Sequence, residues 1–280
     1  MSHPILVFGQ AFAIVYGLVI GSFLAVCILR LPEDRSLLVP SACPRCGARV
    51  RWFDNVPVVS WLVLRGRCRS CGTAISPFYP MVELLTGLLA WLAFRSLVHG
   101  VDDLDAMHAA AWVVRFGFLC LLVVTTFVDV RHRIIPDQTS IYAVPFGIAG
   151  AACLELLGFP GAIGWQQALF GAAFWGGAAA VFSWTVWFVT RVDALGWGDV
   201  KLIAMLGSFL GVLPGTFVVL FWGSLLGSAV GIAVVLAVRR RVWLPFGPPL
   251  ALAAAMYVLF AADPYAEWWS EVTRALQWGS

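Results

Sequence analysis

The sequence predicts an all-helical, multi-pass membrane protein with about eight transmembrane helices and a small polar insert after the first. Of its 280 residues 61% are hydrophobic and 12% are charged, and the mean hydropathy is +0.89. A helix that crosses a bilayer needs about 20 apolar residues at a rise of about 1.5 Å each. Several windows meet that length, so a soluble fold is excluded.

The apolar runs follow one another along the chain. The first, 5–28, carries no charge and has no basic region before it, so we interpret it as a retained helix rather than a cleaved signal peptide. We expect further spans near 79–98, 110–128, 139–158, 165–190, 200–213, 215–238 and 247–262. The span at 200–213 is short and Pro214 follows it, so a broken or tilted helix fits there. These boundaries predict three parts: a first helix (1–29), a polar insert (30–78) and a helical bundle (79–280).

Basic residues are distributed unevenly between the predicted loops. Lys and Arg are retained on the cytosolic side of short loops, so we place the 30–78 insert, with its eight arginines, in the cytosol. Alternating the remaining spans puts seven more of the 18 basic residues on that side, including the cluster at 239–241, and leaves three elsewhere. Acidic residues collect on the opposite face, at 102–105 and at 263–271. No nucleic-acid-binding module is indicated, and we expect the arginines to contact anionic membrane lipid.

The insert contains two Cys-x-x-Cys-Gly knuckles, Cys43-Pro-Arg-Cys46-Gly and Cys68-Arg-Ser-Cys71-Gly, separated by 21 residues. Each knuckle places two thiolates where one tetrahedral ion can be shared, and the following Gly permits the tight turn. We expect one structural zinc ion, because an insert this small and polar cannot build its own core. Disulfides are the competing chemistry, and the reducing cytosol disfavours them.

Two aspartates, Asp129 and Asp199, stand where apolar runs meet short polar breaks. An ionised carboxylate beside hydrocarbon is costly, so each is a functional candidate. Asp129 ends a predicted helix, where the C-terminus disfavours an anion, whereas Asp199 begins one, where the N-terminus favours an anion. Such a pair can supply the acid and the base of a two-aspartate hydrolase. On physical grounds alone, an aspartate at a helix end is more often a cap or a snorkelling partner than a catalyst.

Five neighbouring or boundary residues can support such a site. Gly196 and Gly198 allow an extended peptide backbone to approach closely and let the chain turn into a helix. We interpret Asp137, which follows a proline, as a helix N-cap. Lys201 can orient a carboxylate or a peptide carbonyl, although a positive-inside anchor is the simpler interpretation. Glu83 begins the second span, and we interpret it as a solvated boundary charge.

Motifs spread in order along nearly the whole chain carry a resemblance to a known family. Gly196-Trp-Gly-Asp199 matches the Gly-x-Gly-Asp signature of intramembrane aspartyl proteases, and Asp129 with Ile135-Pro136-Asp137 is similar to the partner motif of type IV prepilin peptidases. Other segments that agree are Gly21-Ser-Phe-Leu, Arg30-Leu-Pro32, the paired knuckles, Asp54-Asn-Val-Pro57, Tyr79-Pro80 with Glu83, and Pro245-Phe-Gly-Pro248. One position departs from the pattern, because the first helix of the family commonly has Asn where this chain has Ala25.

The resemblance implies a function. Members of this family cut the short basic leader from type IV prepilins and pseudopilins at the cytosolic face of the bacterial inner membrane, which serves pilus assembly and protein secretion. Many then methylate the new amino terminus with S-adenosylmethionine. Carried over by motif, Asp129 and Asp199 would be the catalytic pair, supported by Gly196, Gly198, Lys201, Asp137 and Glu83. The active site and the zinc insert would face the cytosol.

Two alternatives come from other functional classes. A transporter could bind a cation at the two aspartates, but its acids should lie near mid-bilayer between inverted repeats. The sequence shows no such repeats, and both acids fall on one face. A membrane scaffold could use a zinc-bearing insert to recruit a partner and keep the aspartates as structural groups. Replacing either aspartate with asparagine separates these possibilities from a hydrolase.

Overall fold

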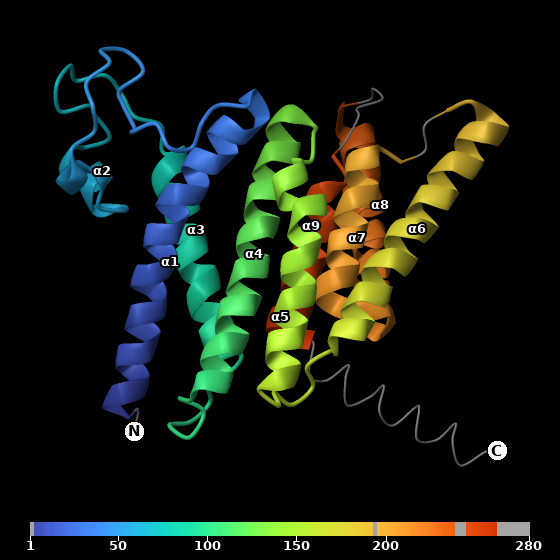
Figure 1. The fold of residues 1–280 in the computed structure, drawn as a ribbon. Coiled ribbons are helices and arrows are strands. Elements are labelled where there is room, and N and C mark those ends of the chain that lie inside the picture. The colour runs from blue at the N-terminus through green and yellow to red at the C-terminus, as the bar shows by residue number, and fades with distance from the viewer. Residues whose placement is uncertain (1–2, 193–194, 239–244, 262–280) are drawn as a thin grey trace. The chain divides into compact units, whose positions relative to one another are not determined.

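A computed structural model describes residues 3–192, 195–238 and 245–261 of the chain (Figure 1). Their regular secondary structure is helical, and the only extended pairings among the described residues are two isolated bridges, Ala42 with Arg49 and Arg67 with Ala74. The predicted all-α class is therefore confirmed. The chain forms two compact units, residues 1–104 and 105–280. The finer division at 29 and 78 stays a prediction.

The N-terminal unit consists of two long helices and the insert between them. The helices are α1 (Pro4–Arg30) and α3 (Phe78–Arg95), and the insert holds the short η1 (Leu31–Glu33), η2 (Trp52–Asn55) and α2 (Val59–Val63). Glycines set how closely the long helices pack: a Cβ on Gly17 would lie 2.6 Å from Cβ of Ala90, and one on Gly21 would lie 2.7 Å from Cα of Glu83. Small residues at such crossings let two membrane helices approach closely.

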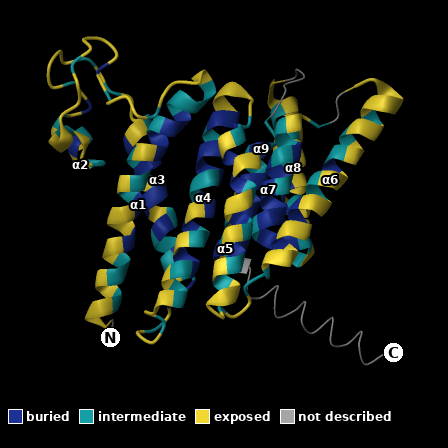
Figure 2. Cartoon of the chain, viewed as in Figure 1, coloured by how far each residue is buried: buried dark blue, intermediate teal, exposed yellow. Residues whose placement is uncertain are grey.

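The C-terminal unit is a helical bundle. Its α-helices are α4 (Ala106–His132), α5 (Val144–Leu156), α6 (Trp165–Thr190), α7 (Trp197–Leu210), α8 (Phe217–Val238) and α9 (Gly247–Met256). Short irregular turns complete it: η3 (Asp137–Thr139), η4 (Ile141–Ala143), η5 (Gly211–Thr216) and η6 (Tyr257–Ala261). Fully buried side chains such as Phe118, Leu202 and Leu250 form its core, and Figure 2 shows buried positions concentrated on α4, α7 and α9.

Helices occur at all eight predicted places along the chain. Five described segments are long and apolar enough to cross a membrane, and the last of them runs from Trp197 to Val238. Leu213 has non-helical backbone angles (φ −138°, ψ 144°) and divides that segment into α7 and α8. Figure 1 shows α8 running back in the direction opposite to α7. The break predicted near Pro214 is therefore present.

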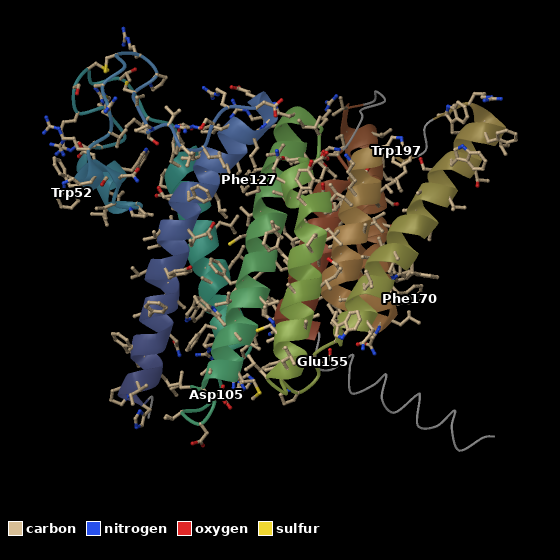
Figure 3. The ribbon with its side chains drawn as sticks, in the orientation of Figure 1. Trp52, Asp105, Phe127, Glu155, Phe170 and Trp197 are labelled. Carbon is tan, nitrogen blue, oxygen red and sulfur yellow. The ribbon has the colours of Figure 1, made fainter. Side chains whose placement is uncertain are left out.

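Basic residues near the helix ends of the C-terminal unit collect at one end of the bundle. The C-terminal ends of α4 and α6 and the start of α7 lie at this end (Figure 1), and these segments carry Arg131, Arg133, Arg191 and Lys201. Asp105 and Glu155 lie at the other end (Figure 3), whereas Asp129, Asp137 and Asp199 lie with the basic residues. The placement of these basic residues agrees with the sorting expected from the sequence. The basic cluster at 239–241 and the acids at 263–271 lie outside the described residues.

Candidate functional site

Asp129 lies in the last turn of α4 and is almost completely buried, with 5% of its surface exposed. The backbone N–H of Gly247, the first residue of α9, donates a hydrogen bond of 2.9 Å to its Oδ2 atom. The C-terminus of α4 offers an anion no donors, so this contact from another helix supplies what its own helix lacks. Asp129 is thus held between the end of one helix and the start of another.

Asp199 is the third residue of α7 and is half-buried. Gly196 is the N-cap of this helix, with an extended backbone (φ −66°, ψ 147°), and its backbone N–H bonds to the Asp199 carboxylate. A carboxylate at the third helical position that reaches back to the N-cap N–H satisfies one of the free donors of a helix start. Gly196 and Asp199 therefore act together to begin α7.

The fold brings the two aspartates together although 70 positions separate them in the sequence. Asp129 acts on Asp199 through a direct Coulombic interaction. Around them, the loop after α4 packs on the first turn of α7, where a Cβ on Gly198 would lie 3.1 Å from Cβ of Ile135. An ion pair of 2.6 Å between Lys201 Nζ and Asp137 Oδ1 fastens the same two segments. The two carboxylates lie at the basic end of the bundle.

The structure corrects the interpretation of Asp137. It is the first residue of η3, the N-cap of that turn is Pro136, and no side chain caps it. The Ser140 hydroxyl instead donates to the Pro136 carbonyl at 2.8 Å. The N-cap prediction is wrong because the chain enters a short 3₁₀ turn rather than an α-helix, and the carboxylate binds Lys201. Lys201 therefore orients a carboxylate, the first of the two roles considered for it.

Glu83 is also placed differently from the expectation. Its residue surface is 7% exposed, and its Oε2 atom accepts a hydrogen bond of 2.7 Å from the backbone N–H of Val58. The solvated-charge interpretation is wrong, because the insert folds back over this end of α3 and covers the carboxylate. Glu83 therefore fastens the insert to α3.

The four predicted metal ligands converge in the insert. The sulfur atoms of Cys43, Cys46, Cys68 and Cys71 all lie within 4.8 Å of one another, and the Cys43 and Cys71 sulfurs are 3.8 Å apart. A tetrahedral ion with metal–sulfur bonds of about 2.3 Å requires sulfur–sulfur edges of about 3.8 Å. The spacing and the all-thiol donor set therefore fit a tetrahedral metal ion.

Both knuckles fold in the same way. In the first, the Cys43 N–H donates to the Ala48 carbonyl and the Gly47 N–H donates to the Cys43 carbonyl. In the second, the Cys68 N–H donates to the Thr73 carbonyl and the Gly72 N–H donates to the Cys68 carbonyl. Gly47 and Gly72 have φ of 70° and 69°, a left-handed conformation that glycine adopts without strain. The backbone N–H groups of Cys46 and Arg45 donate to the Cys43 sulfur and lower the pKa of its thiol, whereas burial and hydrogen bonds with the other three cysteines raise the pKa of Cys71. The first turn thus favours a thiolate at Cys43, the form that a metal needs.

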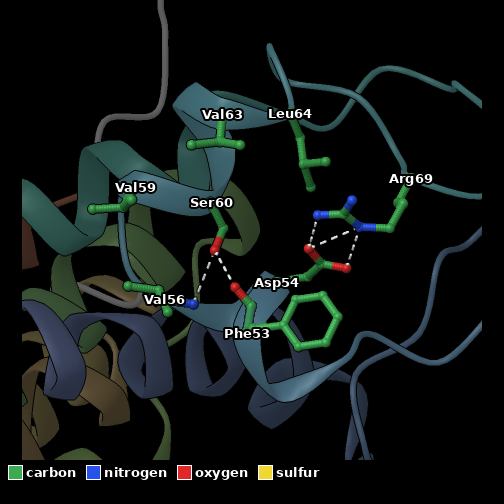
Figure 4. A pocket seen from close by; sticks show the side chains of 8 residues that line it. All are labelled: Phe53, Asp54, Val56, Val59, Ser60, Val63, Leu64 and Arg69. Carbon is green, nitrogen blue, oxygen red and sulfur yellow. Dashed lines mark hydrogen bonds and ion pairs between the residues drawn. The ribbon is translucent and has the colours of Figure 1, made fainter.

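An ion pair connects the second knuckle to the rest of the insert. Arg69 Nη2 lies 2.6 Å from Asp54 Oδ1, and its Nε atom lies 2.9 Å from Oδ2. This two-point contact lowers the pKa of the Asp54 carboxyl. In Figure 4 the Arg69–Asp54 ion pair lies at the edge of a cavity of about 90 Å³. The Ser60 hydroxyl also lines this cavity, where it donates to the Phe53 carbonyl and accepts from the Val56 N–H.

A larger cavity lies between the insert and the adjoining ends of α1 and α3. Its volume is about 520 Å³, and its lining includes Arg30, Trp61, Tyr79 and Glu83. Cavities of roughly 300–1,000 Å³ that are partly apolar and carry a few polar groups are typical of small-molecule sites. The N-terminal unit therefore has room for a cofactor, which no sequence motif had indicated.

Sequence reasoning missed one residue of the aspartate site. Gly247 belongs to the Pro245-Phe-Gly-Pro248 segment, which contributed to the family resemblance but not to the expected site. A glycine at the start of a helix has many uses, so its sequence position alone does not connect it with an aspartate 118 residues earlier. The roles of Gly196 and Gly198 toward a substrate stay predictions.

Comparisons with known proteins cover most of the chain. The model described as "Bacterial Peptidase A24 N-terminal domain" matches residues 15–97, and that of the "Type IV leader peptidase family" matches residues 116–232. A protein of Myxococcus xanthus is 41% identical over 83% of this chain and 66% of its own length. One of Aeromonas salmonicida is 35% identical over 95% of this chain and 94% of its own length. Both are named "Prepilin leader peptidase/N-methyltransferase". No solved structure matches the chain.

Proposed function

The chain belongs to the type IV prepilin leader peptidase family, and from that premise we propose that it cleaves the basic leader of prepilins and pseudopilins with Asp129 and Asp199. The observation that carries this proposal is that a buried carboxylate from the end of α4 and a half-buried one from the start of α7 lie within range of Coulombic interaction at one end of the bundle. Each aspartate also has a main-chain donor, Gly247 or Gly196. Buried acids that interact directly are what a two-aspartate hydrolase requires.

The cleavage step follows from this geometry. One carboxylate removes a proton from a water molecule as the water oxygen attacks the carbonyl carbon of the scissile peptide. The protonated partner donates a hydrogen bond to the carbonyl oxygen, where negative charge develops. Collapse of the tetrahedral intermediate breaks the carbon–nitrogen bond, and the nitrogen takes up a proton from the pair. The leader leaves with a new carboxyl end, and the pilin keeps a new amino end.

Gly196 and the Lys201–Asp137 ion pair support the reaction by where they lie around the aspartates. Gly196 is exposed and extended beside the Asp199 carboxylate, so an extended substrate backbone can approach without meeting a side chain. The Lys201–Asp137 pair fixes the loop after α4 against α7. Its role is to hold the distance between the two segments that carry the aspartates.

We propose that zinc occupies the four-cysteine cluster. Thiolate ligands at this spacing suit a closed structural zinc site, which leaves no coordination position for substrate. Zinc would then fold the insert rather than take part in cleavage. The lack of a β-sheet or sizeable core between residues 34 and 77 supports this role.

We propose further that the protein methylates the amino terminus that cleavage creates, with S-adenosylmethionine as the donor. The cofactor supplies an electrophilic methyl group on sulfur, and the amine nitrogen of the pilin accepts it. The cavity of about 520 Å³ in the N-terminal unit has suitable size. Its buried Glu83 suits the positive charge of such a donor, and Arg30 suits its carboxylate.

The location follows from the same features. The apolar helices indicate a multi-pass protein of the bacterial inner membrane, with lipid around their exposed apolar side chains. We propose that the basic end of the bundle, which holds the aspartate pair, faces the cytosol, because basic residues are retained there. The insert, with its eight arginines, would lie on the same side.

Substitution of the aspartates tests the peptidase proposal. Purified Asp129→Asn and Asp199→Asn proteins should leave a prepilin uncut, while Asp102→Asn, a change in an exposed loop, should cut at the wild-type rate. Mass spectrometry of the substrate reports loss of the leader and addition of a methyl group. Both inactive variants should keep their zinc and still methylate a pre-cleaved pilin. Leader removal by either asparagine variant would refute the assignment.

A further inference from the structure

The start of α9 touches the aspartate pair in a way that the family motifs do not explain. A helix normally begins with several free backbone N–H groups, but α9 begins Gly247-Pro248-Pro249. Proline has no N–H, so Gly247 provides the one donor among these three positions. That donor is directed at Oδ2 of Asp129 at 2.9 Å, inside the protein.

The glycine is required by space rather than by backbone conformation. A Cβ on residue 247 would lie 2.6 Å from Oδ2 of Asp129 and 3.3 Å from its Cγ atom. Gly247 is not among the residues with positive φ, so other amino acids can adopt its backbone angles. The three atoms that a Cβ at this position would approach most closely all belong to the Asp129 side chain.

The position of α9 is fixed from its other side by α8. A Cβ on Gly223 would lie 2.6 Å from Cδ2 of Leu250, and one on Gly227 would lie 3.2 Å from Cγ of Pro249. Helices that meet at glycines pack closely and leave little freedom to shift. The Gly247 N–H is therefore held in place by the rest of the bundle.

We propose that the Gly247 main-chain N–H is a positioning group of the peptidase site, which fixes the rotamer of Asp129 and keeps one of its oxygens occupied. The other carboxylate oxygen is then the one that faces the water and Asp199. A backbone N–H donated to a carboxylate also stabilises its charged form. This inference rests on the proposed peptidase function and adds α9 to the segments that build the site.

The substitution Gly247→Ala tests the proposal, because it keeps the N–H but drives a methyl group against Asp129. A displacement of about 1 Å at a catalytic group can lower the rate about 100-fold. We therefore expect kcat for leader cleavage to fall about 100-fold while KM changes less than threefold. Methylation of a pre-cleaved pilin should continue.

Two control variants separate positioning from general packing. Gly150→Ala adds a methyl group 3.0 Å from Cγ1 of Val114, where α5 packs on α4 about four helical turns before Asp129, and should cleave within threefold of wild type. Gly177→Ala adds a methyl group to α6 where nothing lies within 4 Å, and should also cleave normally. If Gly247→Ala cleaves like these controls, or if Gly150→Ala loses activity equally, the proposal is overturned.

A direct measurement covers the case in which Gly247→Ala does not fold. In protein labelled with ¹⁵N-glycine, the Gly247 amide resonance should shift between wild type and Asp129→Asn, because the charge of its acceptor is removed. An unchanged amide resonance would overturn the proposal. The two tests remain distinct. If Asp129→Asn abolishes cleavage, the peptidase assignment stands even when Gly247→Ala shows no effect.

Discussion

Replacing Glu83 with alanine removes the acceptor that holds Val58 in place. Val58 has φ 61° and ψ −50°, a conformation that a β-branched residue adopts only when its surroundings impose it. The bond from Val58 N–H to Glu83 Oε2 is 2.7 Å long. Loss of the partner of a buried donor costs about 1–3 kcal/mol. A cost of about 2 kcal/mol raises the population of an opened insert about 30-fold.

Limited digestion with trypsin measures this opening, because the insert carries eight arginines. Cleavage of a transiently opened segment follows its population when reclosing is fast, so Glu83→Ala should be cut in the insert about 30 times faster than wild type. Glu83→Gln keeps an oxygen acceptor and should be cut less than about five times faster. Asp102→Ala, which removes an acid from an exposed loop outside the insert, is the control and should behave as wild type. Equal digestion rates for Glu83→Ala and wild type would refute the anchoring role.

Three further predictions concern other parts of the molecule. Lys201→Met and Asp137→Asn should each lower the free energy of thermal unfolding by less than about 1 kcal/mol, because the ion pair is partly exposed, yet each should slow leader cleavage. A double mutant that is no slower than either single variant would show that the pair acts as a unit, and fully additive losses would contradict it. Acidification should release zinc, because the ligands must be thiolates, and trypsin should then cut the insert faster at the pH where metal analysis shows the loss. Asp105 caps α4 by accepting a hydrogen bond of 2.7 Å from the His108 backbone N–H, and this bond lowers the pKa of the Asp105 carboxyl. The stabilisation that the cap gives α4 is present above the ordinary pKa of aspartate and is lost as pH falls through the lowered value. Amide exchange at His108 should therefore accelerate only in that acidic range.

Features encoded by short stretches of sequence could be predicted, whereas contacts between distant segments could not. The four cysteines of the metal cluster follow from two local knuckles with a glycine after each, and the structure brings their sulfurs together. Asp137 was assigned a local role as a cap, but its partner Lys201 is 64 residues away. The burial of Glu83 depends on how the insert folds back, which no hydropathy pattern records. In each case the missing information was the position of another chain segment.

The helix ends at the aspartate pair show how such a distant contact changes the chemistry. From the sequence, Asp129 lies at the C-terminal end of its own helix and Asp199 at an N-terminal end. Asp129 should therefore meet the partial negative charge of a helix dipole and Asp199 the partial positive charge. The fold brings the N-terminus of α9 against Asp129, and each carboxylate therefore meets a helix start and one main-chain N–H. Helix dipoles alone cannot then decide which acid holds the shared proton. What does distinguish them is access: Asp129 is 5% exposed, whereas Asp199 is half-buried beside the exposed Gly196. If substrate enters along Gly196, as we propose, it meets Asp199 first, and we expect its binding rather than the helix ends to make the two acids unequal.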